Sequence, residues 1–217
     1  MNSRPAAGGG RWVDVAPARL TRWLDGFAER HGGPPQVTAG PEGLRLSAPD
    51  GTVAVLSPPP GAPAATDLPA FLSAVTAPRR LGLLLARKGA VAVGVADGDR
   101  LVVSKVDSRY VQGRTAAGGW SQQRFARRRE NQAKAAVADG AELAVRLLLP
   151  EAGRLAALVA GGDRRAVDAI LADRRLASVA ALRAERLLDV PEPRHAVLVE
   201  AIVAARTVRV LVRDPVP

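Results

Sequence analysis

Apolar residues recur at helical spacing near the start of the chain. Leu20, Trp23, Leu24 and Phe27 occupy positions i, i+3, i+4 and i+7 of residues 17–30, and the His-Gly-Gly that follows ends the pattern. A helix over these residues would have one apolar face, which must pack against another element. We therefore expect Trp23 to lie in a core.

Residues 36–60 instead alternate apolar and polar positions around the turn sequences Pro-Glu-Gly and Pro-Asp-Gly. This alternation is typical of strands with one buried face, and it predicts a small β-meander. A loop over 58–69 and a short helix over 70–78 should follow, because prolines are frequent in the first segment and Pro78 ends the second. Residues 11–77 are expected to form an N-terminal helix and β-meander subdomain.

The apolar runs become longer in the second part of the chain. Residues 81–106 predict three consecutive strands, with turns at Arg-Lys-Gly and Asp-Gly-Asp. From Gln122 to about Leu149 the pattern is helical again, because four apolar positions share one face at 100° per residue. These positions are Phe125, Ala136, Leu143 and Leu147.

The rest of the chain alternates between predicted strands and helices. Residues 153–162 predict a buried strand, 163–173 a helix capped by Asp163, 184–206 one or two helices, and 207–214 a closing strand. The Asp-Arg-Arg triplets at 163 and 173 are interpreted as coincidence. The expected fold is mixed α/β: a mixed β-sheet flanked by helices over residues 78–217, with the small N-terminal subdomain as an extension and a disordered tail over 1–10.

Composition limits the possible functions. The 217 residues are 47% hydrophobic, enough for a core, and the net charge of +10 points to a polyanionic partner. The absence of cysteine excludes disulfides, a thiolate nucleophile and a cysteine zinc site, and two histidines make a histidine metal cluster unexpected. No apolar run approaches the length of a membrane span, and residues 1–10 do not resemble a signal peptide. We expect a cytoplasmic protein with no cofactor, no metal and no membrane partner.

Much of the positive charge lies in one stretch. Residues 105–134 carry a net charge of +6, and almost no acidic residues stand three or four positions from the basic ones. This concentration favours contacts with a nucleic-acid backbone over the alternative, a solvated helix face. The basic residues are Lys105, Arg109, Arg114, Arg124, Arg127, Arg128, Arg129 and Lys134.

A glycine-containing loop is predicted between the third strand and this helix, over residues 113–122. Trp120 near its tip has little local surface to pack against, so stacking on a base or docking in a pocket competes equally with folding back onto the sheet. Gln122 is a poor acid, base or nucleophile. Its amide can, however, orient an attacking water or contact an oxyanion.

At these residues the chain resembles the Vms-like release factor family, relatives of the ankyrin-repeat and zinc-finger peptidyl-tRNA hydrolases, and in particular its compact actinobacterial branch. The resemblance rests on a strand, Arg109-Tyr110, a flexible loop with Gly119-x-x-Gln122, and a basic helix. It implies a domain similar to the middle domain of archaeal and eukaryotic release factors. In those factors a glycine-glycine-glutamine tip enters the peptidyl-transferase centre.

The resemblance also implies an activity and partners. These are release of nascent chains from peptidyl-tRNA on stalled or split large ribosomal subunits, by a monomer that contacts peptidyl-tRNA and ribosomal RNA. It assigns catalysis to Gln122, with Gly118 and Gly119 allowing close approach. RNA contacts would come from Arg109, Arg114, Trp120, Arg124, Arg127, Arg128 and Lys134.

Several alternatives stay open at this point. Trp120 and Ser121 separate the glycine pair from Gln122, so Gln123 could serve instead. The activity could also be cleavage of the tRNA 3′ end, or RNA and ribosome binding without catalysis. A metal-dependent nuclease would need converging carboxylates, and Asp97, Asp99 and Asp107 are more simply explained as turn formers.

Overall fold

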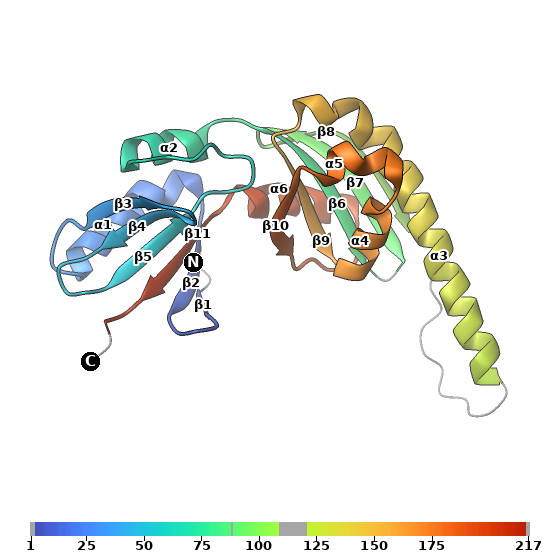
Figure 1. Ribbon diagram of the computed structural model, residues 1–217, viewed down its shortest axis with the longest axis horizontal. Coiled ribbons are helices and arrows are strands. Elements are labelled where there is room, and N and C mark those ends of the chain that lie inside the picture. The colour runs from blue at the N-terminus through green and yellow to red at the C-terminus, as the bar shows by residue number, and fades with distance from the viewer. Residues whose placement is uncertain (1–2, 88, 109–120, 216–217) are drawn as a thin grey trace. The chain divides into compact units, whose positions relative to one another are not determined.

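The computed structural model describes residues 3–87, 89–108 and 121–215, with side chains described at all of these except 108 and 121–133. The chain divides into two compact units. Unit 1 combines Met1–Pro78 with Ala205–Pro217, and unit 2 is Arg79–Ala204. Each unit has its own sheet (Figure 1).

Unit 1 is a six-stranded antiparallel sheet with two helices. The strand order is β1-β2-β11-β5-β4-β3. The strands are β1 (Ser3–Pro5), β2 (Arg11–Val15), β3 (Gln36–Gly40), β4 (Gly43–Ser47), β5 (Val53–Ser57) and β11 (Val208–Arg213). The helices are α1 (Leu20–Arg30), which follows the 3-10 turn η1 (Pro17–Arg19), and α2 (Leu68–Thr76).

The core of unit 1 confirms the predicted apolar face of α1. Its four apolar residues are all buried, and the rings of Trp23 and Phe27 stack with 5.4 Å between centroids. Phe71 of α2 belongs to the same core, which lies against alternate residues of the sheet. Both helices therefore cover one face of this sheet.

The chain's two ends differ from the sequence expectation. Ser3–Pro5 forms a strand paired with β2, and Ala6 and Gly10 close the turn between them with a backbone hydrogen bond of 3.0 Å. Gly8, Gly9 and Gly10 all have positive φ, which explains the glycine run. These residues are not the disordered tail expected for 1–10.

The predicted closing strand, residues 207–214, was also assigned to the wrong sheet. β11 lies between β2 and β5 of unit 1, so residues 78–217 do not form one domain as predicted. The physical reason lies in its alternation. Val208, Val210 and Val212 belong to the core of unit 1, whereas Arg209 and Arg213 take the intervening positions. This pattern suits a sheet with one covered face.

Unit 2 contains the predicted mixed sheet. The strand order is β10-β9-β6-β7-β8, with β10, β9 and β6 parallel and β6, β7 and β8 antiparallel. The three consecutive strands expected over 81–106 are confirmed. The strands are β6 (Arg80–Arg87), β7 (Ala90–Asp97), β8 (Arg100–Ser108), β9 (Ala157–Gly162) and β10 (Arg183–Leu188).

Helices flank this sheet, which confirms the mixed α/β fold class. α3 (Ser121–Leu148), α4 (Arg164–Leu171) and α5 (Ala177–Ala180) contribute to a core on one face of the sheet, together with the 3-10 turns η2 (Leu149–Arg154) and η3 (Arg174–Leu176). α6 (His195–Arg206) lies behind the sheet in Figure 1. Its end is joined to β10 by a hydrogen bond from Arg186 Nη1 to the carbonyl oxygen of Ala204, 3.4 Å long.

One predicted helix is partly wrong. Residues 184–188 belong to strand β10, although their alanine, glutamate, arginine and leucine residues favour a helix. Pairing with β9 overrides that preference, since β-structure depends on neighbouring strands more than on composition. Among the described residues, no helix is both long enough and apolar enough to cross a membrane.

Candidate functional site

Strand β8, which residues 109–120 follow, ends at one edge of the unit 2 sheet. Ser108, the last residue of β8, pairs with Ala90 at the start of β7, and Ala90 also pairs with Arg87 at the end of β6. Gly162, at the end of β9, pairs with Ala86. The strands β6, β8, β9 and β10 therefore all end at this edge, which we call the exit edge.

The start of α4 is fixed at the exit edge by short backbone contacts. The backbone N–H of Asp163 donates to the carbonyl oxygen of Ala86 at 2.7 Å. Gly162 has a φ of 92°, and a Cβ there would lie 2.3 Å from that same oxygen. Only glycine fits this close approach, because a side chain would collide with the backbone of β6.

Asp163 caps α4, as predicted. Its Oδ1 accepts hydrogen bonds from the backbone N–H groups of Arg165 at 2.8 Å and Ala166 at 3.4 Å. Asp173 accepts in the same way from the N–H of Arg175, at 2.9 Å. The two Asp-Arg-Arg triplets are thus the same local structure, an aspartate cap followed by arginines at the start of a helix. The likeness is limited to the cap, and the interpretation of the triplets as coincidence stays a prediction.

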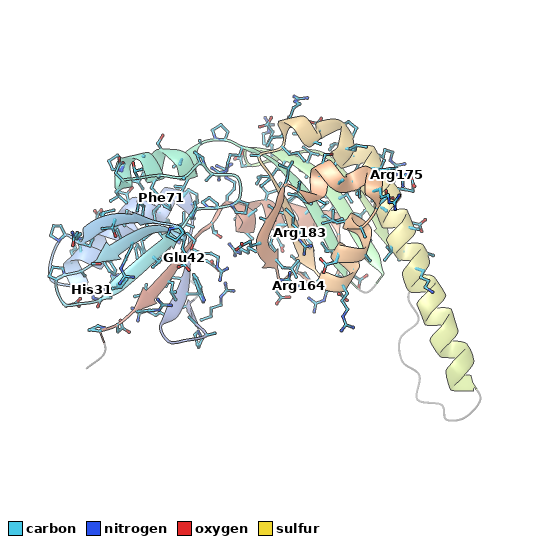
Figure 2. All side chains as sticks on the ribbon, viewed as in Figure 1. His31, Glu42, Phe71, Arg164, Arg175 and Arg183 are labelled. Atoms are coloured by element: carbon cyan, nitrogen blue, oxygen red, sulfur yellow. The ribbon has the colours of Figure 1, made fainter. Side chains whose placement is uncertain are left out.

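Two arginines follow this cap at the exit edge. Arg164 and Arg165 are exposed, and neither side chain has an ion pair or hydrogen bond with another described residue. Figure 2 labels Arg164. These arginines add two positive charges at the exit edge, three strand spacings or about 14 Å from β8, the strand that residues 109–120 follow. Neither arginine was predicted as a site residue from the sequence, although the predicted cap Asp163 could have located both.

Arg87 has a structural role at the same edge. Its Nη1 donates to the carbonyl oxygen of Val190 at 2.5 Å and to Oδ1 of Asp189 at 3.1 Å. The arginine therefore ties the end of β6 to the chain that leaves β10. Asp189 is almost fully exposed, so we attribute the positioning chiefly to the carbonyl bond.

The second half of α3 is anchored in the core. Ala136, Leu143, Ala144 and Leu148 are buried, and Leu147 packs against the same cluster, which confirms these positions of the predicted apolar face. Close packing requires glycine at position 140. A Cβ there would lie 2.8 Å from Ile170 of α4 and 3.1 Å from Val91 of β7.

Most of the predicted site falls where side chains are not described. Arg109, Arg114, Gly118, Gly119 and Trp120 lie outside the described residues altogether. Gln122, Arg124, Arg127 and Arg128 lie within the backbone of α3, whose bounds confirm the predicted helix, but their side chains are outside the described set, as are those of Phe125 and Gln123. Lys134 is described, and its side chain is exposed.

The carboxylates considered for a metal-dependent nuclease do not converge. Asp97 pairs with Arg100 at one end of β8, whereas Asp107 pairs with Val91 near the other end. The β7 positions 91 and 97 are six residues apart, a span of about 20 Å. Oδ2 of Asp97 also accepts a hydrogen bond from Arg80, at 3.0 Å. Within the described part of the chain, no group of three or more histidine or acidic side chains is placed to hold a metal ion.

Comparison with solved structures gives remote similarities. A crystal structure of the archaeal translation termination factor aRF1 matches 74% of this chain at 19% identity, with a TM-score of 0.42. A structure described as an archaeal protein matches 72% at 17% identity, with a TM-score of 0.37. Each match covers 48% of the other chain, so this chain spans about half the length of those proteins. Comparison with curated proteins gives no match.

Comparison with protein families gives a more specific result. The model of the Actinobacteria/chloroflexi VLRF1 release factors matches residues 79–211. That range contains unit 2, the exit edge, the segment 109–120 and the first four residues of strand β11. The chain therefore belongs to the Actinobacteria/chloroflexi VLRF1 release factor family.

Proposed function

We propose that this protein releases nascent chains from peptidyl-tRNA on stalled or split large ribosomal subunits, with Gln122 positioning water at the ester. The observation that carries the proposal is the family match, because it covers every residue from Arg109 to Asn131. A release factor must bring a water to one ester bond inside the ribosome. A glycine-containing segment followed closely by an amide side chain suits that task.

The chemistry asks little of the protein beyond positioning. Water attacks the carbonyl carbon of the ester, and the bond from this carbon to the 3′ oxygen of the tRNA breaks. The proton that the water loses is matched by the proton that the 3′ oxygen gains as it becomes a hydroxyl. The Gln122 amide can accept a hydrogen bond from the water and donate one to the developing oxyanion. Gly118 and Gly119 would allow the backbone to approach the ester closely.

The frame of unit 2 supports this assignment. Residues 109–120 connect an edge strand to a helix whose second half is buried against β7 and α4. A site carried by such anchored elements can be presented reproducibly. The arginines of α3, with Lys134, Arg164 and Arg165, would hold tRNA or ribosomal RNA through phosphate contacts.

The test is single-turnover release from purified large subunits that carry peptidyl-tRNA. The protein should liberate the peptide and leave tRNA with an intact CCA end. A tRNA shortened at its 3′ end would show that the protein cleaves the tRNA and does not hydrolyse the ester. Tight binding with neither product, under conditions where a known release reagent frees the peptide, would reduce the protein to a ribosome-binding module.

A further inference from the structure

The sheet of unit 1 has a second face with its own chemistry. α1 and α2 pack on the face formed by alternate residues such as Val13, Leu46 and Val210. Among the described residues of unit 1, no helix packs on the opposite face, which we call the open face. Strand register places one row of residues across it: Arg4, Trp12, Leu211, Val55 and Arg45.

Positive charge is concentrated on the open face. Two further arginines, Arg209 and Arg213, lie on the central strand β11, two positions to either side of Leu211. Asp14, the cross-strand partner of Arg209, is the acidic residue of the described strands on this face. Arg4, Arg45 and Arg213 are exposed, whereas Leu211 and Val55 between them are buried. The exposed surface is therefore mainly arginine.

Arg209 and Trp12 form a stacked pair. The guanidinium carbon of Arg209 lies 4.2 Å from the centroid of the Trp12 ring. Its Nε is buried and has no hydrogen-bond partner among the described residues. Burial, followed by the charge of Arg4, lowers the pKa of Arg209, and Asp14 opposes this effect. Arg4 approaches Asp14 to 3.9 Å.

This arrangement favours an anionic ligand. A phosphate near Arg4 and Arg209 would offset the repulsion between these two guanidinium groups. The planar Arg209–Trp12 pair offers a surface on which an unpaired base can stack. From Arg4 to Arg45 the row crosses four strand spacings, about 19 Å, which is enough for several nucleotides.

We propose that the open face of the unit 1 sheet binds single-stranded RNA, through phosphate contacts to Arg4, Arg45, Arg209 and Arg213 and base stacking on the Arg209–Trp12 pair. An acidic peptide would satisfy the charges but would make no use of the planar pair. This surface lies in a different unit from the exit edge. The proposed RNA binding is independent of peptide release, and its test requires only the protein and RNA.

The test measures the salt dependence of RNA binding. The probe is a fluorescein-labelled oligouridine of about 20 nucleotides, followed by anisotropy with the full chain. Because the basic helix would also bind, all proteins carry R124A, R127A and R128A. Adding R4A, R45A and R213A should reduce the slope of log affinity against log salt by about 2, since each lost contact to a single strand removes about 0.7.

The matched control removes the same charge from the helix side of the same unit. Arg19, Arg22 and Arg30 are exposed, and R19A, R22A and R30A together should leave the slope unchanged. Trp12→Leu should weaken binding roughly 5- to 100-fold without changing the slope, because it removes stacking and no charge. Circular dichroism would verify that each variant is folded.

Three results would overturn the proposal. One is a wild-type slope in the folded R4A, R45A and R213A variant. Another is an equal loss of slope in the control, which would make the effect one of net charge alone. The third is binding of fluorescein-labelled poly-glutamate with the same affinity and the same dependence on Trp12. This result would indicate that the surface binds an acidic protein and not RNA.

Discussion

Arg175 of η3 forms an ion pair with Glu142 of α3, with 2.5 Å between Nη2 and Oε1. The same Nη2 lies 2.7 Å from Oδ2 of Asp173, the residue that caps η3. Figure 2 shows Arg175 beside α3. This contact ties the outer surface of α3 to the turn that follows α4, while buried residues hold the inner surface. The helix that follows residues 109–120 is therefore fixed on two sides.

The Asp173 carboxylate should make unfolding sensitive to acid. Hydrogen bonds from Arg175 lower the pKa of Asp173 from 3.8 to about 2. Because the folded state holds the carboxylate ionised, its stabilising effect is complete above pH 3.8 and is lost as the pH falls towards 2. Thermal unfolding midpoints of the wild type should thus fall more steeply over this window than those of Asp173→Asn. Parallel curves would mean that water screens the pair at this exposed site.

Overpacking at position 140 should loosen α3. Gly140→Val places atoms against Ile170 and Val91, where even a Cβ is too close, so the variant should lose about 1–3 kcal/mol of stability. The control is Ala138→Val, two positions away on the exposed surface, where only helix propensity is lost, at most about 0.7 kcal/mol. Urea denaturation measures both. Equal losses would show that the sequence at 140 does not govern the packing of α3.

The sequence predicted best those helices and strands whose apolar pattern is long and lies within a single element. α1, the three strands β6 to β8 and the helix α3 follow directly from apolar spacing, and Asp163 acts as the predicted cap. Each of these features depends on neighbours that are close in sequence. Local spacing is therefore sufficient to find them.

Features that depend on distant partners could not be found in this way. β11 alternates like many strands, and only its pairing with β2 and β5 assigns it to unit 1. β10 has a helical composition, and its pairing with β9 decides otherwise. The exit edge likewise needs the register of four strands before Arg164 and Arg165 can be placed at the same edge as the end of β8. Candidate chemistry was visible in the sequence, but its surroundings were not.

The basic face of α3 should determine the salt dependence of ribosome binding. Replacing Arg124, Arg127 and Arg128 by alanine removes three phosphate contacts, so the slope of log affinity against log salt should fall by about 2–3. Binding to purified large subunits over a salt series gives this slope. The variant with R19A, R22A and R30A, which alters α1 instead, should retain it. An unchanged slope in the α3 variant would mean that this helix face is only solvated.

Arg164 and Arg165 should contribute to the same interaction. They are exposed at the exit edge, and R164A with R165A should lower the salt slope by about 1.5 and weaken large-subunit binding at low salt. The matched control is R146A with R174A, because these exposed arginines lie at the last turn of α3 and the start of η3, away from the exit edge. If the control weakens binding as much, net charge and not position explains the loss.

The catalytic assignment depends on a difference between two adjacent amides. α3 begins at Ser121, and neighbouring helix positions are rotated by about 100°, so Gln122 and Gln123 should not be able to serve one ester equally. Gln122→Ala should slow single-turnover release by roughly 10²–10³, equivalent to about 2.7–4 kcal/mol, because one hydrogen bond to the transition state is lost. Large-subunit affinity should stay nearly unchanged, since the amide acts only at the reacting centre.

Gln123→Ala is the control for that experiment and should release peptide at close to the wild-type rate. Gly119→Pro should also impair release, because it restricts the backbone that must approach the ester. If Gln123→Ala were the slower variant, the active amide would be one residue later than the family pattern Gly119-x-x-Gln122 suggests. If both glutamine variants released peptide normally, water would be positioned by other groups. If Gln122→Ala lost affinity and rate together, Gln122 would be a binding contact and not a catalytic residue.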